Sequence, residues 1–273
     1  MLIVLPLILL SAPVLSEMSP TQVDNYLSNL RITCPSFGAR VARVARDALG
    51  TDYENGPLGE GPDGKYDQDP LIDLAHVDCV TYVEQTMALA ASTGFQDAFD
   101  LLQRIRYRDG KIDFASRNHF MVTDWLRANP WCKAITDNLG TPTLTVTRTI
   151  SKRGYFERVD AAELGQDIPD LDYTVTVVPP EHAAQAAKDI TQPSLIVFVG
   201  KVDWLFALHC GLYVPDGAGG GKLYHASSAA GEVVAVDLAE YVTGNQKRYL
   251  GFAAYAIGEP RWGTEKEARD EAA

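Results

Sequence analysis

Hydrophobic residues in the first half of the chain recur at the spacing of amphipathic helices. After Asp78, apolar side chains at Val80, Val83 and Met87 fall on one face of a helix that runs to about residue 91. The same kind of spacing predicts four further helices, over residues 20–29, 37–49, 95–106 and 123–128.

The pattern changes at about residue 141, where apolar and polar residues begin to alternate and β-branched residues become frequent. Alternation of this kind is typical of half-buried strands. It predicts strands over residues 143–149, 173–178, 195–199, 206–214, 222–226, 232–236 and 250–256, with a short Ala-rich helix over 180–189. Helices followed by strands predict an α+β domain with a mostly antiparallel sheet.

The composition of the 273-residue chain is that of a globular protein with a full core, at 46% hydrophobic and 22% charged residues. The formal net charge of −12 argues against nucleic acid as the main partner, because phosphate binding needs a basic surface. The expected organisation is a single domain over residues 17–262, followed by a charged tail over 263–273.

The first 16 residues are an apolar run followed by small residues. They resemble a secretory signal peptide, although no Lys or Arg precedes the run. We therefore expect an exported protein of the periplasm or cell envelope; the alternative is a buried N-terminal helix. No other stretch is apolar enough to cross a membrane, so no membrane span is expected after signal removal.

Cys79 is the candidate nucleophile. Asp78 favours a helix N-cap, which places Cys79 at the first helical position, next to unpaired N–H groups and the positive end of the helix dipole. A thiol there ionises more easily, and the thiolate is the reactive form. The alternative is an inert buried cysteine. Of the other cysteines, Cys34 and Cys132 could pair in an oxidising compartment, whereas Cys210 lies in an apolar strand.

Two histidines lie on neighbouring predicted strands. His209 shares a strand face with the small residues Ala207 and Gly211, and the Gly-rich loop 215–221 separates it from His225. The midpoint of the two histidines is residue 217, inside this loop, which predicts that they are cross-strand neighbours. One imidazole can then orient the other, as in a Cys-His-X triad. The alternative is two independent histidines.

A zinc site made of Cys79, His209 and His225 is a further alternative, because Cys and His are good zinc ligands. The sequence lacks the short paired ligand spacing that is typical of such sites. The expectation is therefore an enzyme without metal or other cofactor.

Arg117, Asn118 and His119 stand side by side just before a predicted helix. Such a polar cluster can bind anionic or amide groups. We expect these three residues to contact the substrate; the alternative is an ordinary exposed loop.

Taken together, four segments resemble the NlpC/P60 superfamily of papain-like cysteine peptidases and amidases: Gly50-Thr-Asp-Tyr53, Asp78-Cys79-Val-Thr-Tyr-Val-Glu84, His209-Cys-Gly-Leu-Tyr213 and Tyr224-His225-Ala-Ser. The Cys79 motif and the Ala-Ser-Arg-Asn-His-Phe segment at 115–120 are more closely similar to the DUF1460, N-acetylmuramoyl-L-alanine amidase-like branch. The resemblance covers residues 35–257. It implies a papain-like α+β fold in which the Cys79 helix packs on a mostly antiparallel sheet.

The resemblance also implies roles. Cys79 would be the nucleophile, His209 the general base and His225 the third, orienting member, whereas Tyr53 and Asp78 would lie at the substrate. The implied substrate is a peptidoglycan stem peptide or muropeptide, cleaved through a thioester. Two departures from the branch are Asp52, where proline is common, and the long acidic loop over 54–73.

Two bonds compete within this reading: the amide between the sugar lactyl group and L-Ala, and the bond from γ-D-Glu to the diamino acid. Pocket shape decides between such bonds, and the sequence does not reveal it. The alternative hypothesis, from another class of protein, is a module that binds the cell wall and has no catalytic activity.

Overall fold

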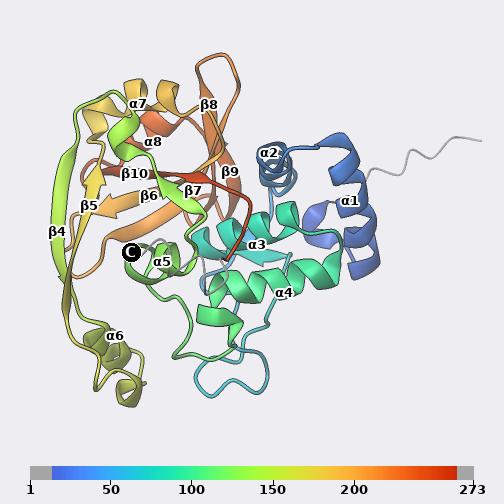
Figure 1. The fold of residues 1–273 in the computed structure, drawn as a ribbon, viewed down its shortest axis with the longest axis horizontal. Coiled ribbons are helices and arrows are strands. Elements are labelled where there is room, and N and C mark those ends of the chain that lie inside the picture. Colours follow the sequence, from blue (N-terminus) through green and yellow to red (C-terminus); the bar gives the residue numbers. More distant parts are fainter. Residues whose placement is uncertain (1–13, 263–273) are drawn as a thin grey trace, which may run out of the picture.

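The amphipathic helices of the first half gather on one side of a sheet built mainly from the second half (Figure 1). The computed structural model describes residues 14–262, so nearly all of the predicted signal peptide and the tail from 263 lie outside the described residues. Four helices form the helical side, α1 (Pro20–Thr33), α2 (Phe37–Asp47), α3 (Cys79–Ala91) and α4 (Phe95–Arg106). Their positions confirm the predicted helices.

The main sheet contains eight strands in the order β2-β1-β9-β8-β7-β6-β10-β3. Every pairing in it is antiparallel except that of β1 with β2. The strands span Asp52–Tyr53 (β1), His76–Val77 (β2), Cys132–Ala134 (β3), Ser194–Gly200 (β6), Ala207–Pro215 (β7), Gly221–Ser227 (β8), Glu232–Val236 (β9) and Tyr249–Ile257 (β10). The predicted mixed α+β architecture with a mostly antiparallel sheet is therefore confirmed.

Two predicted strands do not join this sheet. β4 (Leu144–Ile150) and β5 (Leu171–Val177) pair only with each other over their length, and one bridge, Val178 to Phe252, links their end to β10. The hairpin keeps one face toward solvent and packs the other on the sheet through Val175 and Val177. The prediction of a mostly antiparallel sheet did not foresee this separate hairpin, because alternation specifies a buried face and not a strand's neighbour.

Several short elements had no sequence signal. They are β3, α6 (Lys152–Arg158) and α8 (Leu238–Gly244), all too short to show a period. The predicted Ala-rich helix is present as α7 (Ala183–Asp189). Where a helix was predicted over 123–128, a π-helical turn at Met121–Trp125 leads into α5 (Leu126–Ala128). Among residues 14–262 no helix has the length and apolarity needed to span a membrane.

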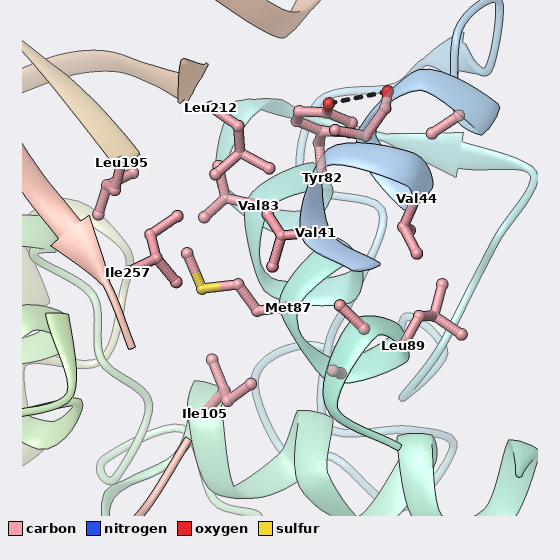
Figure 2. Packing of buried hydrophobic residues seen from close by; sticks show 14 of the residues in the cluster. Val41, Val44, Tyr82, Val83, Met87, Leu89, Ile105, Leu195, Leu212 and Ile257 are labelled. Carbon is pink, nitrogen blue, oxygen red and sulfur yellow. Dashed lines mark hydrogen bonds between the residues drawn. The ribbon is translucent and has the colours of Figure 1, made fainter. Parts of the chain in front are cut away.

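Helix α3 is the buried centre of the fold. It lies between α2 and α4 on one side and the strands β7 and β8 on the other. Figure 2 shows Val83 and Met87 of this helix directed toward Leu212 and Ile257 of the sheet. Burial of such side chains stabilises a fold by roughly 1.5–3 kcal/mol each, so the position of α3 on the sheet is firmly fixed.

A buried ion pair joins α3 to α4. Arg106 Nη1 lies 2.6 Å from Glu84 Oε2, and the Trp125 indole donates to the other Glu84 oxygen at 2.9 Å. Both charged side chains are about 95% or more buried. Separating the two side chains would leave two uncompensated buried charges, which is energetically costly. The ion pair therefore holds α3, the helix that carries Cys79, against α4.

Candidate active site

Cys79 is the first residue of α3, as predicted. Asp78 is the N-cap, and its carboxylate accepts hydrogen bonds from the N–H groups of Val80 and Thr81 at 2.9 and 2.7 Å. The Asp78 carbonyl accepts from the N–H of Tyr82. Of the first four helical N–H groups, only that of Cys79 therefore has no hydrogen-bond partner within residues 14–262.

The two predicted histidines are in direct contact. His209 Nε2 lies 2.9 Å from His225 Nδ1, and the ring planes are almost perpendicular, at 87°. The predicted register is nevertheless wrong by two residues. β7 pairs with β8 through Leu212 opposite Tyr224, and this register continues to Gly211 opposite His225. The histidines are therefore diagonal neighbours on one face, near enough to share a proton.

Gly211 makes the diagonal contact possible. A Cβ atom at this position would lie 2.7 Å from the Tyr224 carbonyl oxygen and 2.9 Å from the His225 Cβ. Both distances are below normal van der Waals contact. A side chain at 211 would therefore push β8, and His225 with it, away from His209.

The Cys79 thiol is half-buried and surrounded by hydrogen-bond donors. The Cys210 thiol donates to the Cys79 carbonyl at 3.1 Å. Hydrogen bonds from Cys210 and from His209 lower the pKa of Cys79 below its ordinary value, against the effect of burial. The site therefore favours the thiolate, the nucleophilic form.

His225 is held neutral. Only 2% of the residue is exposed, and burial, followed by the charge on His209, lowers the pKa of His225 to about 4. A neutral imidazole can accept the His209 Nε2–H at its Nδ1, which leaves His209 Nδ1 for the sulfur. The Phe198 ring stacks on His209 and the Tyr241 ring packs against both histidines, which restricts their orientation.

A cavity of about 380 Å³ brings these groups together. Tyr53, Asp78, Cys79, His209 and His225 all line it. Burial and the nearby Cys79 raise the pKa of Tyr53, so its hydroxyl stays protonated and can donate a hydrogen bond. Sequence reasoning missed another part of the lining, which comes from α8 and the start of β10: Tyr241, Asn245, Arg248 and Tyr249.

The structure does not bring the cluster at 117–119 to this cavity. Arg117 forms ion pairs with Glu60 and Asp67, and His119 bonds the Phe114 carbonyl at 2.7 Å and the Tyr155 hydroxyl at 2.9 Å. Arg117, Asn118 and His119 line a separate cavity of about 460 Å³. Contact between these residues and substrate stays a prediction.

All four cysteines are free thiols, so Cys34 and Cys132 are not paired. Within residues 14–262, no group of three or more His, Cys, Asp or Glu side chains is arranged to hold a metal ion.

Comparison with known proteins gives consistent results. Residues 43–251 match the family model described as N-acetylmuramoyl-L-alanine amidase-like. A DUF1460 protein from Legionella pneumophila has a similar structure, with a TM-score of 0.78 and 21% identity over 88% of this chain and 96% of that one. An N-acetylmuramoyl-L-alanine amidase from Bacteroides uniformis is also similar, with a TM-score of 0.64 and 23% identity over 81% of this chain and 98% of that one.

No curated protein matches the sequence. The family model nevertheless covers most of the chain, from α2 to the start of β10 and through every segment that lines the Cys79 cavity. The chain belongs to the N-acetylmuramoyl-L-alanine amidase-like family.

Proposed function

We propose that the protein is a cysteine amidase that hydrolyses the amide between the lactyl group of the peptidoglycan sugar and L-Ala, and that its fold is of the papain-like NlpC/P60 type. One observation carries the proposal: Cys79, His209 and His225 line the same cavity, and the two histidines share a hydrogen bond. A nucleophile, a base and an orienting group in this order are the parts that acyl transfer needs.

The mechanism follows from these contacts. His209 takes the Cys79 proton, and the thiolate attacks the carbonyl carbon of the amide. The carbon–nitrogen bond breaks as His209 returns the proton to the leaving amine, and a thioester remains on Cys79. His209 then takes a proton from the water that attacks the thioester; the carbon–sulfur bond breaks, the acid leaves, and His209 returns the proton to the Cys79 sulfur. His225 accepts the His209 Nε2–H throughout and so holds the ring in position.

The oxyanion formed during attack needs hydrogen-bond donors. The Cys79 N–H is available because the Asp78 side chain and carbonyl occupy the next three N–H groups of the helix. The Tyr53 hydroxyl lines the same cavity and supplies a second donor. A hydrogen-bond donor that already points at the position of the oxyanion stabilises the transition state by about 3–4 kcal/mol.

The description of the family, N-acetylmuramoyl-L-alanine amidase-like, supports the choice of substrate class and of the amide between the lactyl group and L-Ala. Such a substrate lies outside the cytoplasmic membrane, in agreement with the predicted signal over residues 1–16 and a periplasmic or cell-envelope location. Cleavage between γ-D-Glu and the diamino acid uses the same residues and is the second candidate.

Digestion of purified muropeptides, followed by mass spectrometry, tests the proposal. We expect the wild-type protein to release peptides that begin with L-Ala. The Cys79→Ala variant is expected to release none while its circular dichroism spectrum is unchanged. The matched control is Cys34→Ala, which removes a thiol that does not line the cavity and should leave turnover unchanged.

The other outcomes identify the alternatives. Peptides that begin with the diamino acid would assign the endopeptidase reaction. Wall binding without product would assign a silent binding module. Turnover that survives Cys79→Ala, or that is lost with a chelator and restored by zinc, would refute cysteine catalysis.

A further inference from the structure

Arg248 gives the Cys79 cavity a positive charge that the reaction does not use. Among residues 14–262, it is the only Lys or Arg that lines this cavity. The acidic lining residue, Asp78, is already engaged by two backbone N–H groups of α3. A cationic side chain that lines the same cavity as Cys79, on a chain with a net charge of −12, indicates that the cavity receives an anionic group.

The backbone of Arg248 is fixed, whereas its side chain is exposed. Its N–H donates to the Asn245 carbonyl at 2.8 Å, and its carbonyl accepts from the Lys201 N–H at 3.0 Å. The guanidinium carbon lies 5.5 Å from the centre of the Tyr249 ring. Within residues 14–262, no carboxylate forms an ion pair with Arg248.

The charge of Arg248 acts across the whole cavity. Burial raises the pKa values of Tyr53, Tyr241 and Tyr249, and the Arg248 charge opposes the rise at all three. Tyr53 comes from β1 and the other two from α8 and β10. The guanidinium charge is therefore felt at residues from three different elements that line the cavity.

We propose that Arg248 is a specificity residue that binds a carboxylate of the substrate one residue from the scissile amide. This inference rests on the proposed function. In a stem peptide that continues from L-Ala into γ-linked D-Glu, the free α-carboxylate of D-Glu is the first negative charge beyond the cleaved bond. A guanidinium can bind it through two parallel hydrogen bonds, which fix the peptide's orientation as well as its position.

The test compares two muramyl dipeptides that differ in one group. One ends in D-Glu with a free α-carboxylate, and the other ends in D-isoglutamine, where that carboxylate is an amide. For wild-type protein we expect a KM about tenfold lower for the acid than for the amide. Arg248→Gln should raise KM for the acid by about the same factor, change KM for the amide little, and leave kcat within about twofold.

Two variants serve as controls. Lys247→Gln removes the same charge from the neighbouring exposed residue, which does not line the cavity, and should preserve the preference for the acid. Arg248→Lys keeps the charge without the two-point geometry and should retain part of the preference. Equal kinetics for the two dipeptides in wild-type protein, or equal losses on both in Arg248→Gln, would overturn the inference.

Binding separates this inference from the proposed function. The two dipeptides are titrated calorimetrically into Cys79→Ala and into Cys79→Ala/Arg248→Gln. Tighter binding of the acid that depends on Arg248 would support the inference even if wild-type protein hydrolyses neither compound. Equal binding of both compounds to Cys79→Ala would refute the inference while hydrolysis by wild-type protein still stands.

Discussion

Cys210 shows how a core residue can take part in the chemistry of a neighbouring one. Alternation along β7 predicts a buried side chain at 210, and the residue is 1% exposed. Its thiol also donates to the carbonyl of Cys79 and lowers the pKa of the Cys79 thiol. Periodicity identifies which face of a strand is buried. It does not identify which atom of the neighbouring helix accepts a hydrogen bond from that face, so this contact was not predictable from the sequence.

Replacing Cys210 by valine is expected to raise the pKa of Cys79. Valine fills a similar volume but has no proton to donate, so the thiolate loses one hydrogen bond and keeps that from His209. The rate of Cys79 alkylation by iodoacetamide, measured against pH, should therefore shift to higher pH. The matched control is Cys132→Val, which alters a buried thiol outside the cavity. An unchanged pH profile in Cys210→Val would show that His209 alone stabilises the thiolate.

At the scale of elements, the hairpin of β7 and β8 determines how the histidines meet. The two strands and their Gly-rich loop were predictable, but the register was not. Pro215 pairs with Gly221, and the Asp216 carboxylate accepts from the N–H groups of Ala218 and Gly220, which centres the turn at residue 218. A turn centred one residue later than the midpoint of the histidines moves them from opposite to diagonal positions.

Gly211→Ala is expected to disrupt this arrangement. The new methyl group would overlap the Tyr224 carbonyl and the His225 Cβ, so β8 must move away from β7. We expect a loss of about 1–3 kcal/mol in the free energy of unfolding, together with a large fall in kcat at temperatures where the variant is folded.

The control for this variant is Gly244→Ala, at a position where an added Cβ has no atom within 4 Å. Urea denaturation and activity assays on both variants give the comparison. If Gly211→Ala retained full activity, the close approach of His209 and His225 would not be required for turnover.

At the scale of the whole molecule, two neutral histidines, the half-buried His119 and the buried His225, make stability depend on pH. Burial lowers the pKa of His119 and of His225 to about 4, whereas the unfolded chain titrates near 6.5. Between these values the unfolded state binds more protons, so stability falls as the pH is lowered. We expect a loss of about 1–2 kcal/mol for each histidine between pH 7 and pH 5.

Urea unfolding of wild-type protein, His119→Gln and His182→Gln at pH 7 and pH 5 measures this dependence. His119 lies outside the Cys79 cavity, so its replacement should reduce the loss between the two pH values. His182→Gln, at a histidine that lines neither cavity, controls for the substitution itself. A wild-type loss that His119→Gln does not change would contradict the assignment of His119 as a neutral group.

Local patterns were enough to predict much of the molecule. Asp78 and the apolar spacing after it identified α3 and the position of Cys79, and alternation identified every long strand. They were not enough for the separate β4–β5 hairpin or for the cavity wall that carries Arg248. Both depend on which surfaces meet after the chain has folded. The 117–119 cluster illustrates the same point, since Glu60 and Asp67 bind the Arg117 side chain from a distant loop.

The sulfur and the imidazole come from segments far apart in the sequence, and this separation makes Cys79 a built-in reporter of the folded state. In an unfolded chain its thiol has no partner and ionises near 8.5. At mildly acidic pH, a thiol-selective dye would therefore label folded molecules quickly and unfolded ones slowly. The extent of early labelling therefore measures the fraction of folded protein in a mixed sample, and no tag has to be added.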